Sequence, residues 1–219
     1  MEKKIKVKDY SKYIISEIIL LLLTLGLMIS VYYQFNFINS IDNFVFKICE
    51  FIRNNIVNNI FFIFTLMGES YVIITILVVL LLLPTRKRNV FIALFTIMSA
   101  IMNELLKIII ARPRPIGQFV NNLLFKYKFP NGFSFPSGHA QTASVFYFLL
   151  FHLLIKYYYK GKHKKLLNII SIAIPIMISI SRVVIGVHYF TDILCGLLIA
   201  SMIIILYLLL EKIYLSSSK

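Results

Sequence analysis

The chain has 219 residues, 59% of them hydrophobic, with a mean hydropathy of +0.85 and a net charge of +14. This hydropathy excludes a soluble globular domain and indicates an integral membrane protein. The positive charge does not indicate a nucleic-acid partner, because the lysines cluster in short loops between apolar runs, where they set topology and attract anionic membrane lipids. Cys49 and Cys195 are too far apart in sequence to indicate a zinc site or a disulfide framework.

The apolar runs predict an all-α, six-span transmembrane helical bundle that forms one membrane domain over residues 1–219. A run of about 20 residues crosses the hydrocarbon layer of about 30 Å. The first run follows a basic start without a small-residue cleavage site, so we expect an uncleaved span. In the fifth, Pro175 predicts a kink. The predicted spans are about 13–33, 60–83, 90–110, 137–155, 166–182 and 189–210.

The loop charges predict that both termini are cytoplasmic in a multi-pass protein of the cell membrane, because lysine and arginine are enriched in cytoplasmic loops. These basic residues lie in the N-terminal tail and in the second and fourth loops. They are Lys3, Lys4, Lys6, Lys8, Lys12, Arg86, Lys87, Arg88, Lys156, Lys160, Lys162, Lys164 and Lys165.

The first external loop is predicted to contain a short amphipathic helix that lies on the outer surface, with Ser40 as its N-cap. Its apolar residues recur at three- and four-residue spacing and are Ile41, Phe44, Val45, Ile48, Ile52 and Ile56. The third loop is also external, yet it is basic and has no acidic residue, which indicates a bound anion. Its Lys126 and Lys128 could equally be ordinary residues of a solvated loop.

Three short strings at the ends of predicted spans contain side chains suited to phosphoryl transfer. In the first, Lys107 precedes Arg114-Pro115, within a stiff Arg-Pro repeat whose guanidinium groups at Arg112 and Arg114 suit bidentate phosphate binding. In the second, Pro136-Ser137-Gly138-His139 opens a helix, and helix N-termini bind anions.

The third string combines Ser181-Arg182 with His188 and Asp192. The four-residue spacing places the carboxylate on the same helical face as the imidazole, where it can fix the tautomer of the ring. A purely structural histidine–aspartate pair is the alternative. Glu104 lies one turn before Lys107 and could pair with it, and Glu69 lies within a span and could border a substrate entrance.

Together these strings resemble the type 2 phosphatidic acid phosphatase superfamily, which includes bacterial lipid phosphatases, glucose-6-phosphatase and the vanadium haloperoxidases. The resemblance covers residues 107–192, and Thr65-x2-Gly68 is also similar to the family. It implies that His188 is the nucleophile, oriented by Asp192, and that His139 is the general acid and then the base. The implied phosphate-binding residues are Lys107, Arg114, Ser137, Gly138 and Arg182.

The resemblance also implies a reaction without metal or other cofactor, with the active site at the external face. We expect hydrolysis of a lipid phosphate or diphosphate such as undecaprenyl diphosphate, phosphatidic acid or phosphatidylglycerophosphate, through a phosphohistidine. Three alternatives remain open: a lipid phosphotransferase that uses the same site, a phosphatase for a water-soluble ester, and a non-enzymatic phospholipid-binding or transport protein. The sequence does not indicate an oligomeric state.

Overall fold

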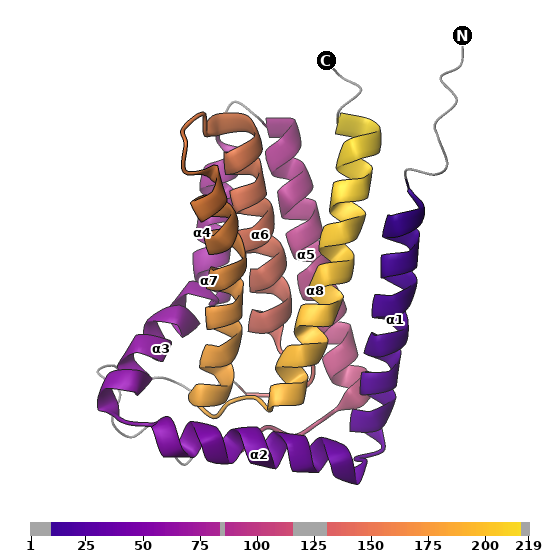
Figure 1. Cartoon of the computed structure of the whole chain (residues 1–219), viewed down its shortest axis with the longest axis vertical. Helices are drawn as coiled ribbons and strands as arrows, with labels where there is room; N and C mark the ends of the chain where they lie inside the picture. Colours follow the sequence, from indigo (N-terminus) through magenta and orange to yellow (C-terminus); the bar gives the residue numbers. More distant parts are fainter. Residues whose placement is uncertain (1–9, 84–85, 116–130, 216–219) are drawn as a thin grey trace.

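The computed structural model describes residues 10–83, 86–115 and 131–215, in which all regular elements are helices. The long helices lie side by side, and α2 lies across one end of the bundle (Figure 1). The elements are α1 (Ser11–Tyr32), α2 (Asn36–Ile52), α3 (Asn55–Met67), α4 (Ser70–Leu81), α5 (Arg86–Ile110), η2 (His139–Ala143), α6 (Ser144–Leu153), η3 (Leu154–Tyr158), α7 (Lys164–Val184), α8 (Phe190–Leu210) and η4 (Glu211–Leu215).

The all-α prediction is confirmed, whereas the count of six spans stays a prediction. Among the described residues, four helices are long and apolar enough to cross a membrane, and a fifth span results if α3 and α4 form one broken span. The predicted span 137–155 is helical throughout, because η2, α6 and η3 follow one another without a break from His139 to Tyr158. Lys3, Lys4, Lys6, Lys8, Lys126 and Lys128 lie outside the described residues.

The second predicted span, 60–83, is a bent pair of helices rather than one continuous helix. Helix α3 ends at Met67, α4 begins at Ser70, and their axes differ by 43°. Gly68 lies at this break, as expected for a residue that favours helix ends over helix interiors. By contrast, α7 runs unbroken from Lys164 to Val184 with Pro175 inside it.

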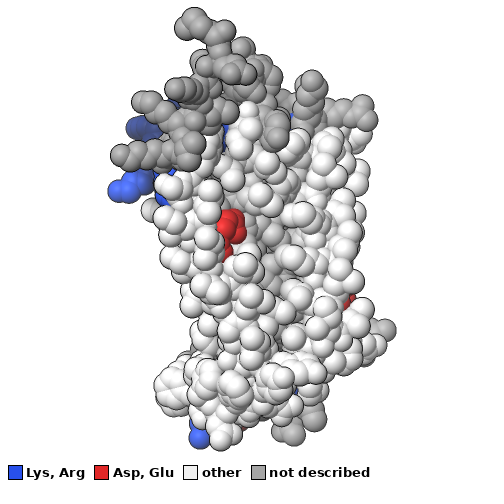
Figure 2. Space-filling model, turned by 90° about the vertical axis from the view of Figure 1, so that its right-hand side faces the viewer, with Lys and Arg blue, Asp and Glu red and all other residues white. Residues whose placement is uncertain are grey.

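The bundle presents a largely apolar surface to its surroundings, as a protein surrounded by lipid must. Basic side chains appear toward the ends in Figure 2, with a broad uncharged face between them that only a small acidic patch interrupts. Many large apolar residues of the long helices are exposed, including Leu22 on α1 and Ile108 on α5. Hydrophobic burial therefore does not drive these helices together in the bilayer, and close packing of their surfaces must do so.

Small residues allow α8 to approach η2 closely. A Cβ atom placed on Gly196 would lie 2.9 Å from the backbone oxygen of Ser137 and 3.0 Å from Cβ of Ala140. Ala200, one turn further along α8, and Ala143 on η2 are also fully buried. This seam of small residues brings the first turn of η2 against the first turns of α8, as close helix pairs in membranes require.

Buried amides connect α5 to the same segment. The Asn103 side-chain amide donates to Gln141 Oε1 at 2.9 Å and to the Pro136 carbonyl at 3.2 Å. The Gln141 amide in turn donates to the Ser99 carbonyl at 2.9 Å. Because an unpaired polar group in an apolar bundle costs several kcal/mol, about 2–7, this chain of bonds fixes the position of α5 relative to the Pro136–His139 turn.

Helix α2 has three faces at helical spacing. Buried residues face the bundle, apolar residues are exposed on a second face, and polar residues occupy the third. The bundle-facing residues are Ile38, Asp42, Val45 and Cys49; the exposed apolar residues are Phe37, Ile41, Phe44, Ile48 and Phe51; the polar residues are Asn36, Asn39, Ser40, Asn43, Lys47 and Glu50. The prediction of an amphipathic helix is therefore confirmed, except that Ile56 belongs to α3 and not to this helix.

The predicted start of this helix at Ser40 is wrong. The helix begins one turn earlier, at Asn36, and Ser40 lies inside it with its hydroxyl donating to the Asn36 carbonyl at 2.9 Å. An exposed apolar stripe beside a polar one is the pattern of a helix at a membrane interface. We therefore expect the exposed apolar residues of α2, among them Phe44, to contact lipid.

Tryptophan substitution tests this expectation, because the chain has no tryptophan of its own. In vesicles that contain brominated phospholipid, we expect strong quenching of Phe44→Trp fluorescence, since that side chain is exposed on the apolar stripe. The neighbouring Asn43→Trp, on the polar face, should be quenched much less. Equal quenching of the two probes would contradict an interfacial placement of α2.

Candidate active site

The predicted site residues converge at the end of the bundle that α2 crosses. Five elements end or begin there: α5 at Ile110, η2 at His139, α7 at Val184, α8 at Phe190, and the segment that follows α5. Two hydrogen bonds of Ser134 hold this last segment. Its amide donates to the Arg112 carbonyl at 2.8 Å, and its hydroxyl donates to the Pro113 carbonyl at 3.1 Å.

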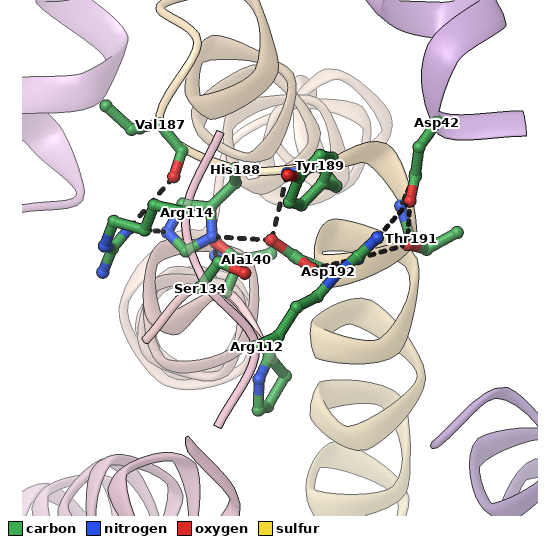
Figure 3. A network of polar contacts seen from close by, with 12 residues as sticks. Asp42, Arg112, Arg114, Ser134, Ala140, Val187, His188, Tyr189, Thr191 and Asp192 are labelled. Atoms are coloured by element: carbon green, nitrogen blue, oxygen red, sulfur yellow. Dashed lines mark hydrogen bonds and ion pairs between the residues drawn. The ribbon is translucent and has the colours of Figure 1, made fainter. Parts of the chain in front are cut away.

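His188 and Asp192 form a buried pair, as their spacing predicts. His188 Nδ1 lies 3.2 Å from Asp192 Oδ2, and Arg114 Nη1 lies 3.0 Å from His188 Nε2 (Figure 3). A guanidinium group can only donate, so Nε2 must accept and the proton must reside on Nδ1, where it is donated to Asp192. The lone pair of the neutral ring therefore points toward Arg114.

The surroundings of His188 favour this neutral form. The side chain is buried, and burial is the main cause of a pKa well below the ordinary histidine value, followed by the positive charges of Arg182 and Arg114. The charges of His139 and Lys107 act in the same direction. The imidazole is therefore unprotonated, and able to act as a nucleophile, at neutral pH.

The predicted phosphate-binding residues surround this ring. Arg114 also donates to the Val187 and Gly132 carbonyls at 3.0 and 3.2 Å. Arg182 is almost completely buried at the end of α7. Lys107 Nζ lies 2.6 Å from Glu104 Oε1, which confirms the predicted pair, and it is close to Gly138.

Ser137 and Gly138 lie at the start of η2, as predicted. The Ser137 hydroxyl accepts a long hydrogen bond of 3.4 Å from the Ala140 amide, which is a weak cap, and the Ser137 amide donates to the Asp192 carbonyl at 3.1 Å. The second bond joins the first turn of η2 directly to the first turn of α8. The start of η2, which favours an anion, therefore lies beside His188, whereas the Tyr189 and Thr191 amides at the start of α8 are already bound by the Asp192 and Asp42 carboxylates.

His139 lies on the opposite side of the site, next to the break between α3 and α4. Its Nε2 is 3.5 Å from Glu69 Oε1, and the same carboxylate oxygen is 3.9 Å from Arg182 Nη1. The Glu69 side chain is partly exposed, so the predicted position at an entrance is compatible with the structure. The link from Glu69 to His139 could not be inferred from their sequence positions, which are 70 residues apart.

Arg112 does not have the role that the Arg-Pro repeat indicated. Instead of facing an empty anion site, its Nη1 donates to Asp192 Oδ1 at 2.7 Å and its Nη2 donates to Asp42 Oδ2 at 2.6 Å. Sequence reasoning missed Asp42 entirely as a site residue. The available signal was its helical spacing from Ile38, Val45 and Cys49 on the bundle-facing side of α2, where an aspartate without a partner would be costly.

No metal site emerges from the geometry. Among the described residues, no three histidine, cysteine, aspartate or glutamate side chains gather where a metal ion could be held. The cations in the site are lysine and arginine side chains, whose donors match the oxygen atoms of a phosphate group.

Known proteins share both the sequence motifs and the fold. The sequence profile of the PAP2 superfamily matches residues 88–213 of this chain. The chain belongs to this superfamily. The predicted family and the prediction of a membrane phosphatase are thereby confirmed.

Individual PAP2 proteins match over most of the chain. Phosphatidylglycerophosphatase B of Bacillus subtilis is 30% identical over 74% of this chain and 78% of its own length. An undecaprenyl-diphosphatase of Sulfolobus acidocaldarius is 27% identical over 77% of each chain. The crystal structure of a transmembrane PAP2-type phosphatidylglycerolphosphate phosphatase from Bacillus subtilis superposes with a TM-score of 0.80 and 26% identity, covering 91% of this chain and 97% of that one.

Gly68 tests the placement of His139. A Cβ atom at position 68 would lie 2.4 Å from His139 Cδ2 and 2.7 Å from Ile178 Cγ2, so Gly68→Ala must displace the imidazole ring. We expect phosphatase activity to fall about 10-fold or more, because small misplacements of a reacting group are costly. Gly26→Ala is the matched control, since nothing lies within 4 Å of its added Cβ. Wild-type activity in the Gly68→Ala protein would contradict a role for His139 at this position.

Proposed function

We propose that this protein hydrolyses a lipid phosphate or diphosphate at the extracytoplasmic membrane surface through a phosphohistidine intermediate. The observation that carries the proposal is the geometry of His188. Its Nε2 lone pair points at the tip of Arg114, while Nδ1–H is held by Asp192. A phosphate that replaces His188 as the partner of the Arg114 guanidinium group would bring its phosphorus atom next to Nε2.

In the first step Nε2 of His188 attacks phosphorus, and the bond from phosphorus to the lipid oxygen breaks as the N–P bond forms. Asp192 stabilises the positive charge that develops on the ring. Lys107, Arg114 and Arg182, with the Ser137 hydroxyl and the Gly138 amide, stabilise the phosphoryl oxygens. His139, whose Nε2 lies 3.5 Å from Glu69 Oε1, donates a proton to the departing oxygen.

In the second step the now neutral His139 accepts a proton from water, and the water oxygen attacks the phosphohistidine. The N–P bond breaks, inorganic phosphate leaves, and both histidines return to their starting states. A diphosphate substrate follows the same course, with a lipid monophosphate as the first leaving group. If an alcohol replaced water at this step, the same site would act as a phosphotransferase.

The relatives support a lipid as the substrate. Their names specify a phosphatidylglycerophosphate and undecaprenyl diphosphate, two lipids that present a terminal phosphate at the membrane surface. This chain supports the same class by its own features, because the basic site lies at the end of an apolar bundle beside α2, which has an exposed apolar stripe. We propose that the head group enters this site while the hydrocarbon tail stays in the outer leaflet.

Phosphate release from a panel of substrates tests the reaction. With EDTA present, we expect release from diphosphate lipids, phosphatidic acid or phosphatidylglycerophosphate in preference to sugar phosphates, and inhibition by vanadate. His188→Ala should lower the rate by about three orders of magnitude, because the nucleophile is lost. His163→Ala is the control, since His163 is exposed and lies outside the site.

Two results would contradict the proposed mechanism. The first is activity that requires added magnesium, and the second is undiminished turnover in the His188→Ala protein. A product that forms only when an alcohol acceptor is added would identify the transferase alternative. Binding of the lipids without any turnover would identify a lipid-binding or transport protein.

Cysteine labelling tests the proposed orientation. The native Cys49 and Cys195 are buried, so the labelling background should be low. Lys47→Cys on the polar face of α2 should react with a membrane-impermeant maleimide in intact cells. Lys160→Cys, in the exposed turn at the opposite end of the bundle, should react only after permeabilisation. The reverse pattern would place the site at the cytoplasmic face.

A further inference from the structure

A charged cluster behind the active site joins α2 to the His188–Asp192 pair. Arg112 is enclosed by two carboxylates, with Nη2 at 2.6 Å from Asp42 and Nη1 at 2.7 Å from Asp192. Its guanidinium carbon lies 3.9 Å from the centre of the Tyr189 ring. The side chains of Asp42 and Asp192 have exposed fractions of only 2% and 0%. The mechanism proposed above assigns no role to Asp42 or Arg112.

We propose that Asp42 and Arg112 are positioning residues that orient Asp192 and set its electrostatic effect on His188. This inference rests on the proposed function. In this arrangement α2 contributes to catalysis from the membrane surface, although none of its side chains contacts the substrate.

The hydrogen bonds leave the Asp192 carboxylate with one orientation. Its Oδ2 accepts from the Tyr189 amide at 3.0 Å and lies 3.2 Å from His188 Nδ1, while its Oδ1 accepts from Arg112 (Figure 3). Without Arg112, Oδ1 would lose its charged donor, and rotation of the carboxylate would break the bond to the ring. Arg112 thus acts on the nucleophile through Asp192.

Asp42 holds Arg112 and the start of α8 together. Its Oδ1 accepts from the Thr191 amide at 2.9 Å, and its Oδ2 accepts from the Thr191 hydroxyl at 2.8 Å. The same hydroxyl accepts from Arg112 Nη1 at 2.8 Å. These hydrogen bonds of Asp42 are therefore made to groups that touch Asp192 or belong to its helical turn.

A phosphate-binding role for Arg112 is the competing interpretation, and the charges oppose it. Two carboxylates already occupy its terminal nitrogens, and together they raise the pKa of Arg112 despite the opposing effect of burial. A phosphate group beside this pair would face two negative charges. Arg114, two residues along, instead donates to the Gly132 and Val187 carbonyls and lies beside the Nε2 atom of His188.

The acid limb of the pH profile of kcat/KM separates positioning from simple structural support. Charged and titratable groups face His188 from every described element around it. They are Asp192 on α8, Arg182 on α7, Lys107 on α5, His139 on η2, Glu69 between α3 and α4, Arg114 and Arg112 after α5, and Asp42 on α2. Removal of a negative charge disfavours protonated His188, and removal of a positive charge favours it.

We therefore expect two single variants to move the acid limb in opposite directions. Asp42→Asn should move it to lower pH and Arg112→Gln to higher pH, each by about 0.5 unit or more. In the double variant Asp42→Asn/Arg112→Gln the removed charges cancel, and the limb should return toward its wild-type position. kcat should fall about 10-fold in Arg112→Gln with KM little changed, because the phosphate-binding residues remain.

Two control variants match the changes on α2. Glu50→Gln removes a negative charge from the exposed polar face of the same helix, and Ile38→Ala removes a buried packing contact from the bundle-facing side. Neither should move the acid limb, although Ile38→Ala should lower thermal stability in detergent. Ionisation of the substrate affects all variants equally and so cancels from the comparison.

The outcomes distinguish this inference from the proposed function. If the wild-type protein releases no phosphate from any substrate, the proposed function fails. If the wild type is active but the acid limbs of Asp42→Asn and Arg112→Gln coincide with it or move in the same direction, Asp42 and Arg112 only support the structure, and the inference is wrong. Opposite shifts with recovery in the double variant support it, even where one single variant is unstable.

Discussion

The pairing of Arg112 with two buried carboxylates is the interaction on which the rest of the site depends. A guanidinium group and two aspartates lie at the edge of an apolar bundle, where an ion without a partner would be strongly disfavoured. Loss of one partner from such a group costs about 3–5 kcal/mol. This constraint fixes α2, the segment after α5 and the first turn of α8 relative to one another, and His188 lies immediately before that turn.

Close packing supplies the second constraint, on the opposite side of the site. Because lipid offers no hydrophobic drive for helix association, the approach of η2 to α8 depends on Gly196 and on the buried Ala140 that faces it. The bond from the Ser137 amide to the Asp192 carbonyl then joins the two helix starts. This direct backbone contact between the start of η2 and the start of α8 places His139 and His188 at a common site.

The sequence motifs identified residues that the structure brings together near His188, but they did not identify Asp42, which pairs with Arg112. Each motif lies at the end or the start of an apolar run. Because successive predicted spans cross the membrane in alternating directions, Lys107, His139, Arg182 and His188 are predicted to lie at the same membrane face. No such rule connects Asp42 with Arg112, since nothing in the linear pattern says which of two neighbouring arginines turns toward a carboxylate. The break at Gly68 was missed for a similar reason: hydropathy does not register a bend within an apolar run.

The carboxylates around the site differ in how firmly they are held, and this difference bears on how an anion could enter. Asp42 and Asp192 are buried and accept several hydrogen bonds each, so they are permanent partners of Arg112. Glu104 is 69% exposed and Glu69 is 24% exposed. Exposed ion pairs contribute little to stability, about 0–1 kcal/mol, so a phosphate could displace Glu104 from Lys107 at small cost. The inner pairs preserve the geometry of His188, while the outer pairs neutralise the cations that the proposed substrate would bind.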